Sequence, residues 1–233
     1  MDEHLSASRL LAIPGLRNLR DVGGLGAVRP GLVYRSAWLV DLTDEGARAL
    51  AKLGLRTVLD LRDADELVGQ PDRTHDLNVD LANFPVLPQD GSYHHGLPPE
   101  ETYALIMDSA GPVFVAALRR LLEPQALPAL VHCAIGRDRT GLLIALLLDL
   151  LDVPQEEILA DYLLSNEGLG VLDGPVPYVD PQGVTRYTKP VPAELLTGAL
   201  ERIRERHGSV EDYLLAHGLK EAELHGLRAT LRE

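Results

Sequence analysis

The chain has 233 residues, a formal net charge of -13 and 45% hydrophobic residues. This composition predicts a folded globular protein, and the negative charge disfavours sequence-independent binding to nucleic acid or to an anionic membrane. A single cysteine, Cys133, excludes an internal disulfide and any multi-thiolate metal site. The histidines show no metal-binding spacing, so we expect neither a metal nor another cofactor.

The chain carries no segment that suggests a membrane span or a secretory signal. The apolar run 142–151 is interrupted by Asp149 and is far shorter than the roughly 20 residues that span a bilayer. Residues 1–15 include acidic side chains and lack the apolar run of a signal peptide. We expect a cytoplasmic protein without stable membrane association; secretion by a non-classical route and the oligomeric state stay open.

Short apolar strands alternate with amphipathic or buried helices along the first 170 residues. In chain order the expected elements are a strand at 31–36, a helix at 42–54, strands at 55–61 and 77–86, helices at 98–110 and 112–123, a strand at 127–133, and helices at 140–151 and 154–167. Such alternation predicts a three-layer α/β fold, in which helices cover both faces of a sheet.

The segment 171–192 is rich in proline and glycine and has no predicted secondary structure. A structureless stretch of this length is either a lid over a functional site or a plain surface excursion. Residues 193–233 read as helices that end at glycines. No clean linker separates a second domain, so we expect residues 1–233 to form one domain.

The loop HCAIGRDRTG, residues 132–141, connects a buried strand to a buried helix. Free backbone N–H groups and the helix dipole make such a junction an anion site, and positive potential there favours the thiolate of Cys133. Arg139 offers a planar fork that matches two phosphate oxygens and the equatorial oxygens of a phosphoryl-transfer transition state.

The other positions of this loop also have predicted tasks. Gly136 allows a tight turn with inward N–H groups, and His132 is expected to hold the thiolate geometry by bonding to the loop backbone. Thr140 is expected to donate a hydroxyl hydrogen bond to the sulfur. The alternative is an inert buried cysteine with Arg139 in a surface ion pair, which explains neither Gly136 nor the Thr-Gly pair.

HCAIGRDRTG resembles the signature loop of the cysteine-dependent protein tyrosine and dual-specificity phosphatases, and more narrowly that of a bacterial family with an HCxxGKDRTG loop. Further segments resemble the same family: RNLRDVGG at 17–24, GLVYRS at 31–36, VLDLRDADE at 58–66, DYLLSN at 161–166, and the C-terminal pattern at 208–231. The resemblance covers nearly the whole chain. It implies a tyrosine-phosphatase-like fold with a central sheet of four or five strands, a phospho-cysteine intermediate at Cys133 and no metal.

The resemblance also assigns phosphate or substrate binding to loop and neighbouring residues. These are His132, Ala134, Ile135, Gly136, Arg137, Thr140, Arg20 and Asp21. Arg137 replaces the family's lysine, which leaves the details of substrate contact open. Arg20 and Asp21 are read either as part of the pocket wall or as an ion pair in a glycine-rich turn. Asp60 and Arg62 follow a strand, where they orient the loop or contact the substrate.

The general acid is assigned to Asp138, which lies inside the loop beside Arg139. The tryptophan-proline-aspartate motif of classical tyrosine phosphatases is absent, because Trp38 is not followed by Pro-Asp. Asp90, in the segment PVLPQDG, is the alternative acid. A third interpretation has Asp138 only pairing with Arg137 or capping the helix.

Substrate class is the least determined prediction. A deep site favours phosphotyrosine, whereas a wider one with further cations, such as Lys189 and Arg186 from the proline-rich segment, admits phosphoinositides. We rank a phosphotyrosine or dual-specificity protein phosphatase first and a phosphoinositide phosphatase second. A non-catalytic phosphate-binding module is the alternative from another class. Rhodaneses and arsenate reductases do not require His132 or the Arg-Thr-Gly run.

Overall fold

A mixed sheet lies at the centre of the protein, for which a computed structural model describes residues 9–74, 77–88, 97–179 and 183–233. Within these residues the sheet has five strands in the order β1-β2-β5-β3-β4. The strands are β1 (Arg20–Asp21), β2 (Val33–Ser36), β3 (Thr57–Asp60), β4 (Asp80–Asn83) and β5 (Ala129–His132). The β1 strand runs antiparallel to β2, and the remaining pairs are parallel.

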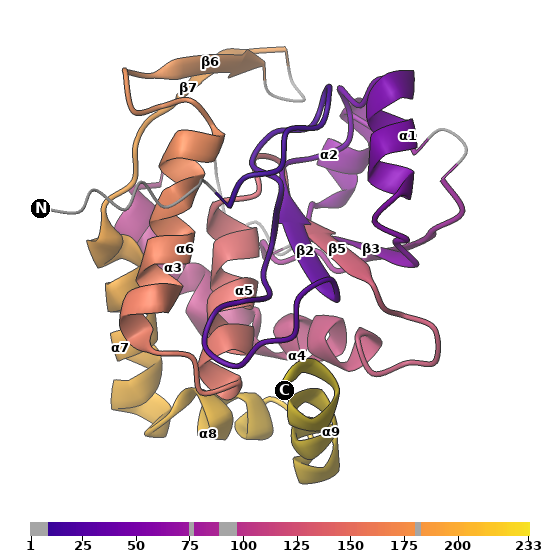
Figure 1. Cartoon of the computed structure of the whole chain (residues 1–233). Helices are drawn as coiled ribbons and strands as arrows, with labels where there is room; N and C mark the ends of the chain where they lie inside the picture. Colours follow the sequence, from indigo (N-terminus) through magenta and orange to yellow (C-terminus); the bar gives the residue numbers. More distant parts are fainter. Residues whose placement is uncertain (1–8, 75–76, 89–96, 180–182) are drawn as a thin grey trace, which may run out of the picture.

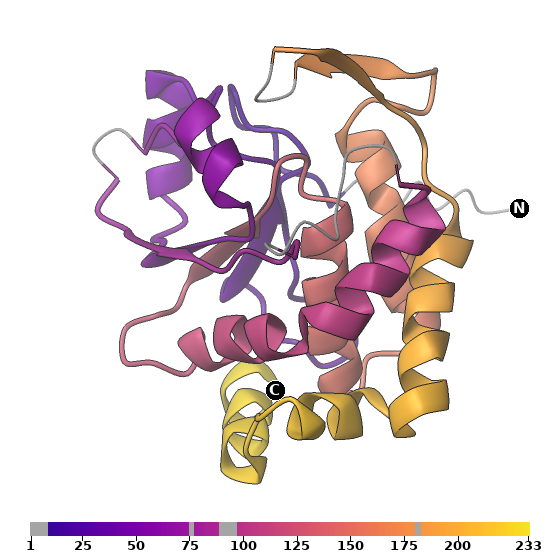
Figure 2. The same ribbon diagram turned by 180° about the vertical axis from the view of Figure 1, so that it is seen from behind.

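Helices follow or separate these strands, and all of them except α2 are predicted by the sequence. They are α1 (Asp44–Ala51), α2 (Ala64–Gly69), α3 (Pro99–Ser109), α4 (Gly111–Arg120), α5 (Asp138–Leu150), α6 (Gln155–Gly168), α7 (Ala193–His207), α8 (Val210–Ala216) and α9 (Glu221–Leu231). Figures 1 and 2 show the sheet between α1 on one side and the larger group of helices on the other. The predicted three-layer fold is confirmed, and of the four or five strands expected in the central sheet the structure has five. In the described part of the chain no helix is long and apolar enough to cross a bilayer.

Alternating side chains along each strand divide the apolar residues between the two faces of the sheet. Val58 and Leu130 pack with the buried residues of α1 in a smaller core. Leu59 and Val131 point the other way, into the larger core that includes most of α5. The strands β2, β3 and β5 are buried on both faces, which explains why β5 reads as a continuous apolar run.

The sequence did not predict α2, a helix of six residues. Its N-terminus is fixed by a capping box, in which Asp63 accepts from the Glu66 backbone N–H and Glu66 accepts from the Asp63 backbone N–H. The short helix lacks the repeated apolar face that identifies longer helices in a sequence. Its importance lies in placing Glu66 beside the β5–α5 junction.

The proline-rich segment is not structureless, so this prediction is wrong. It forms an antiparallel ribbon of β6 (Val176–Val179) and β7 (Thr185–Thr188). Pro177 is tolerated because a two-stranded ribbon has open edges on which a missing N–H donor removes no ladder bond. Figure 1 shows the ribbon at the end of the molecule that also carries α2, beyond the sheet.

Three parallel strands end at the same edge of the sheet. In register, His132 lies opposite Ser36 of β2 on one side and opposite Asp60 of β3 on the other. The carboxyl edge of an open parallel sheet is where ligands bind in such folds. Residues 133–139, which we call the signature loop, leave the sheet at this edge.

Candidate active site

The signature loop turns sharply between β5 and α5. Gly136 has a φ of +67°, and a Cβ built there would lie 1.9 Å from the Ser36 carbonyl oxygen. Glycine is therefore required twice, for the left-handed backbone and for the close approach of two chain segments. Cys133 is 1% exposed, and the Trp38 backbone N–H donates to the Ala134 carbonyl oxygen at 3.0 Å.

Side chains behind the loop bind its carbonyl groups. Asn18 Nδ2 donates to the carbonyl oxygens of Ile135 and Gly136 at 3.2 and 3.0 Å, and Arg35 Nη2 donates to that of Gly136 at 2.9 Å. A trans peptide points its C=O and N–H in opposite directions. The N–H groups that follow these carbonyls therefore point away from Asn18 and Arg35, as an anion cradle requires.

A buried carboxylate anchors this supporting layer. Asp161 of α6 contacts Arg9 at 3.2 Å, Arg20 at 2.9 Å and Arg35 at 2.6 Å. Burial raises the pKa of Asp161, but Arg35 and Arg20 outweigh it and lower the pKa to about 2. Asp161 thus balances part of the positive charge that holds the loop.

Neither Arg20 nor Asp21 is among the described residues that line the pocket in front of the loop. Arg20 is fully buried and donates to Asp161 and Asn18. Asp21 accepts from the backbone N–H groups of Gly23 and Gly31. Of the two interpretations of this segment, a glycine-rich turn with an ion pair matches these positions better than a pocket wall does.

The guanidinium of Arg139 is fixed by Glu66, which is not among the predicted site residues. Glu66 accepts from Arg139 Nη1 at 2.5 Å and from Nη2 at 2.8 Å. Burial lowers the pKa of Arg139, but the Glu66 carboxylate outweighs it and raises the pKa far above its ordinary value. Two sequence signals point to Glu66: the capping-box spacing from Asp63, and its place in the segment VLDLRDADE that resembles the family.

Asp138 lies in a chain of hydrogen bonds. Tyr103 donates to Asp138 Oδ1 at 2.7 Å, and the Tyr103 hydroxyl lies 2.7 Å from that of Tyr162. Arg137 Nε donates to Asp138 Oδ1 at 3.1 Å. Burial raises the pKa of Asp138, but Arg137 and the Tyr103 hydrogen bond outweigh it and lower the pKa. The pairing with Arg137 is therefore real, and it leaves the carboxylate ionised at rest.

Of the hydrogen bonds predicted for Thr140 and His132, the structure has only the one of His132. The Thr140 hydroxyl is buried and has no hydrogen-bond partner among the described residues, so the expected bond to the sulfur is not formed. His132 Nδ1 lies 3.1 Å from the Cys133 carbonyl oxygen, which confirms its bond to the loop backbone.

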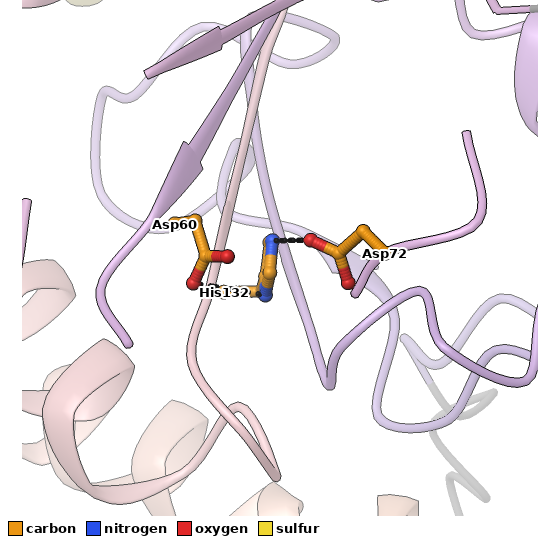
Figure 3. Close-up of side chains that lie close together, drawn as sticks. All are labelled: Asp60, Asp72 and His132. Atoms are coloured by element: carbon orange, nitrogen blue, oxygen red, sulfur yellow. Dashed lines mark ion pairs between the residues drawn. The ribbon is translucent and has the colours of Figure 1, made fainter. Parts of the chain in front are cut away.

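Below the loop, Asp60, Asp72 and His132 lie close enough for their ligand atoms to fall within 4.8 Å of one another (Figure 3). Such a trio resembles a cation site. However, Arg62 Nη2 already lies 2.7 Å from Asp60 Oδ2 and 2.9 Å from Asp72 Oδ2. The guanidinium takes the place of the cation, so these residues do not fit a metal site.

A pocket of about 400 Å³ opens in front of the loop. Its polar lining comes from Arg137, Asp138, Arg139 and Glu66. Its other walls are largely apolar and aromatic, with contributions from Trp38, Leu87, Tyr103, Ile106, Tyr178 and Tyr187. The tyrosines at 178 and 187 come from the ribbon, which therefore forms part of the pocket rim.

The ribbon reaches the pocket without bringing its cations into it. Lys189 is exposed and contributes its backbone carbonyl oxygen, which accepts from Arg137 Nη1 at 2.7 Å. Neither Lys189 nor Arg186 is among the described pocket-lining residues. The expectation that these side chains add cations to the site is not met among the described residues, since the ribbon contributes Tyr178 and Tyr187 to the pocket lining.

The site is that of a cysteine-dependent phosphatase. Its cysteine follows a buried strand, the carbonyls of its glycine turn are bound from behind, and its arginine lies at the start of the next helix. The family described as "Tyrosine phosphatase family" matches residues 11–233. The chain belongs to this family.

Curated relatives agree with this assignment over most of their lengths. The chain is 30% identical to the triple specificity protein phosphatase PtpB of Mycobacterium tuberculosis, over 94% of this chain and 98% of the relative. It is also 30% identical to a tyrosine-protein phosphatase of Nostoc commune, over 88% and 76% respectively.

Solved structures with more distant sequences are also similar. The TpbA phosphatase of P. aeruginosa, in complex with pTyr, is 18% identical, with 97% of both chains covered and a TM-score of 0.41. The catalytic domain of the PP-IP phosphatase SIW14 of S. cerevisiae is 21% identical, with 65% of this chain and 76% of that chain covered and a TM-score of 0.41.

Replacing Gly136 by alanine is expected to disable the loop while leaving the core folded. The added Cβ meets the Ser36 carbonyl and forces the loop to move, and a shift of about 1 Å at such a site costs on the order of 100-fold in kcat/KM. Gly24→Ala is the matched control, because Gly24 has a φ of +80° and nothing within 4 Å of the built Cβ. Equal losses of aryl phosphatase activity in both variants would contradict the steric argument.

The Asp161 network predicts a loss of stability in acid. The pKa of Asp161 is about 2 in the folded protein, against about 3.9 when unfolded, so its contribution is present above about pH 4 and is lost as the pH falls toward 2. The loss amounts to about 2–3 kcal/mol of unfolding free energy. Urea unfolding across this range measures it, and Asp161→Asn should be less stable at neutral pH and show a flatter acid profile. An identical profile in both proteins would refute the assignment.

Proposed function

We propose that the protein hydrolyses phosphate monoesters of tyrosine through a phospho-cysteine intermediate at Cys133. The proposal rests on one observation: the signature loop, which can bind an anion, opens into a pocket with aromatic walls. Arg139, fixed by Glu66, faces the same space as the tyrosines of the ribbon. A phosphoryl group in the cradle places an aryl leaving group against those walls.

The loop residues divide the chemistry between them. The Cys133 thiolate attacks phosphorus and displaces the phenolic oxygen, and water then hydrolyses the phospho-cysteine. The backbone N–H groups of the loop and the Arg139 fork bind the equatorial oxygens, whose charge is spread in the transition state. Glu66 keeps the fork in one plane and so reduces the ordering needed when the substrate binds.

Asp138 is proposed as the general acid that protonates the leaving oxygen. Its ion pair with Arg137 keeps it ionised at rest, whereas a general acid must carry a proton. A phosphate dianion in the loop competes for Arg137 and repels the carboxylate, and both effects favour the protonated form. Substrate binding therefore raises the proton affinity of the Asp138 carboxylate, as its role as general acid requires. The alternative acid, Asp90, lies outside the described residues.

The charges of the pocket support a substrate with one phosphate and an apolar body. Arg137 and Arg139 are the cations among its described lining residues, and each is paired with a carboxylate, Asp138 or Glu66. A phosphoinositide phosphatase is the second candidate, favoured by the cation of Arg137 within the loop. The name of the M. tuberculosis relative, triple specificity protein phosphatase, is compatible with more than one kind of substrate.

The proposal includes one catalytic domain that acts in a reducing compartment. The buried residues of α7, α8 and α9 belong to the same core cluster as those of β5 and α5, which supports a single domain. The nucleophile is a free thiol, which persists in the cytoplasm and is oxidised in secreted environments.

A side-by-side assay tests the reaction and the substrate class. Phosphotyrosine, phosphoserine and phosphothreonine peptides and a phosphoinositide are compared with chelator present, and the phosphotyrosine peptide is expected to give the highest kcat/KM. Cys133→Ser should lower turnover by about 10⁴-fold or more while retaining phosphate binding. Tight phosphate binding without turnover in the unmodified protein would instead identify a binding module.

The acid assignment is tested by the dependence on the leaving group. Asp138→Asn should lower kcat for phenyl phosphate by about 10²–10⁴-fold and change it little for an aryl phosphate whose phenol leaves readily without a proton. Asp90→Asn is the matched variant and should show no such selectivity. If the dependence appears in Asp90→Asn and not in Asp138→Asn, the acid is Asp90.

A further inference from the structure

Two buried tyrosines form a hydrogen-bonded row with the Asp138 carboxylate, and the mechanism above does not use them. Tyr103 of α3 is 3% exposed and Tyr162 of α6 is 1% exposed. The Tyr103 hydroxyl donates to Asp138 Oδ1 at 2.7 Å, and the Tyr162 hydroxyl lies 2.7 Å from that of Tyr103. Buried polar groups are costly unless each has a partner, so the three groups hold one another in place.

The direction of the hydrogen bonds in this row is fixed. A carboxylate only accepts hydrogen bonds, so Tyr103 uses its one hydroxyl proton for Asp138. The bond between the two hydroxyls then takes its proton from Tyr162. Burial, and next the negative charge of Asp138, raise the pKa of both tyrosines, so both stay protonated at neutral pH. The donors therefore run from Tyr162 through Tyr103 to Asp138.

The two oxygens of Asp138 have different surroundings. Oδ1 accepts from the Tyr103 hydroxyl at 2.7 Å and from Arg137 Nε at 3.1 Å. Among the described residues, the one donor to Oδ2 is Arg137 Nη2 at 3.3 Å. A proton on Oδ1 would meet the hydrogens of two donors, so the acid is protonated on Oδ2. Because Asp138 lines the pocket, this oxygen is the one that can reach a leaving group.

Tyr103 is the contact that Asp138 keeps when a phosphate dianion binds. Arg137 is a cation, and the phosphate competes with Asp138 for it. Tyr103 is neutral and is not drawn away in this manner. Its bond to Oδ1 also persists in the protonated acid, in which Oδ1 is the carbonyl oxygen and still accepts. A neutral donor therefore orients the carboxyl group in both protonation states.

The sequence next to the signature loop leaves room for this row. A Cβ built on Gly141, in the first turn of α5, would lie 3.0 and 3.2 Å from two ring carbons of Tyr162. A side chain at this position would therefore require the ring to shift. Tyr162 also follows Asp161, which anchors the loop through Arg20 and Arg35. The Tyr162 hydroxyl is thus placed by the same helix that supports the loop carbonyls.

We propose that Tyr103, supported by Tyr162, is a positioning residue that assigns the proton of the general acid to Asp138 Oδ2. The inference deepens the proposed function and rests on its assignment of Asp138. Oδ2 gives its proton to the phenolic oxygen as the P–O bond breaks and the S–P bond forms. In the second step Oδ2 takes a proton from the attacking water, as the new O–P bond forms and the S–P bond breaks. One oxygen serves both steps because Tyr103 occupies the other throughout.

Other charged groups also act on this carboxylate. Those beside the row are Arg35, Arg137 and Arg139, and Glu66 is paired with the last of them. Burial raises the pKa of Asp138, whereas Arg137, the Tyr103 hydrogen bond and Arg139 lower it. Removal of the Tyr103 hydroxyl leaves the ion pairs of both loop arginines in place. The effect of the hydroxyl can therefore be measured separately from that of the charges.

The test removes the hydroxyl by Tyr103→Phe, which keeps the ring and its packing. Phenol release from phenyl phosphate is followed against pH in a single turnover, where the rate falls as the pH rises through the pKa of the acid. Loss of a hydrogen bond to the ionised form raises the pKa of Asp138, so the midpoint of this fall should move up by about one pH unit. On the plateau the rate should fall roughly tenfold, because the carboxyl group is no longer held in one orientation.

Two further variants separate positioning from loss of packing. Tyr162→Phe should move the midpoint in the same direction by less, since Tyr103 keeps its bond to Asp138 and loses only its own donor. Tyr213→Phe is the matched control and should leave the midpoint unchanged. Its buried hydroxyl donates to the Met107 carbonyl oxygen of α3 at 3.0 Å, so the change removes one hydroxyl bond to the same helix. A lower rate at every pH with an unmoved midpoint in Tyr103→Phe, or an equal shift in Tyr213→Phe, would overturn the inference.

NMR measurements need no turnover and cover the case in which a variant does not fold. In protein with ¹³C-labelled aspartate, the carboxyl resonance of Asp138 should titrate about one pH unit higher in Tyr103→Phe than in the unaltered protein. In the unaltered protein the Tyr103 hydroxyl proton resonance should move as Asp138 titrates, and a resonance that does not respond would overturn the inference.

The two kinds of measurement distinguish this inference from the proposed function. A raised Asp138 titration in Tyr103→Phe, in a protein that hydrolyses no phosphate ester, would refute the proposed function and retain Tyr103 as the residue that positions this carboxylate. Hydrolysis that depends on Asp138, with no shift in Tyr103→Phe by either measurement, would refute the inference alone.

Discussion

The hydrogen bonds that Asn18 and Arg35 make to the carbonyls of Ile135 and Gly136 are the contacts on which the rest of the site depends. A loop that presents N–H groups to an anion has to place its carbonyls elsewhere, and a buried carbonyl without a donor is costly. The cationic donor Arg35 then needs Asp161, and Asp161 also takes Arg20 and Arg9. Much of the polar sequence near the N-terminus thus exists to support one turn of backbone.

Charge pairing explains how a chain with a net charge of -13 builds an anion site. Each buried cation near the loop has a carboxylate partner: Arg35 has Asp161, Arg139 has Glu66, and Arg137 has Asp138. The positive potential is therefore local and directional and does not depend on the overall field. Fixed partners also reduce the reorganisation that an incoming phosphate requires.

The fold and the loop were predictable because their signals are local. Apolar runs with marked ends located β2, β3, β5 and α5 correctly, and the turn at Gly136 follows from the need for a left-handed residue. The ribbon was missed because its prolines suggested a loop, although strands with open edges accept them. Glu66 was missed for another reason. Its contact with Arg139 joins residues 73 positions apart in the chain, which neither periodicity nor spacing reveals.

Arg137 makes two hydrogen bonds at once. Its Nε donates to Asp138, and its Nη1 donates to the Lys189 carbonyl oxygen, next to the ribbon. An anion that draws this guanidinium into the pocket must take it from the ribbon. Anion capture and attachment of the pocket rim thus compete for one side chain, and part of the binding free energy is consumed in releasing that contact. Product departure returns the side chain to Lys189, so the same exchange favours turnover over tight retention of phosphate.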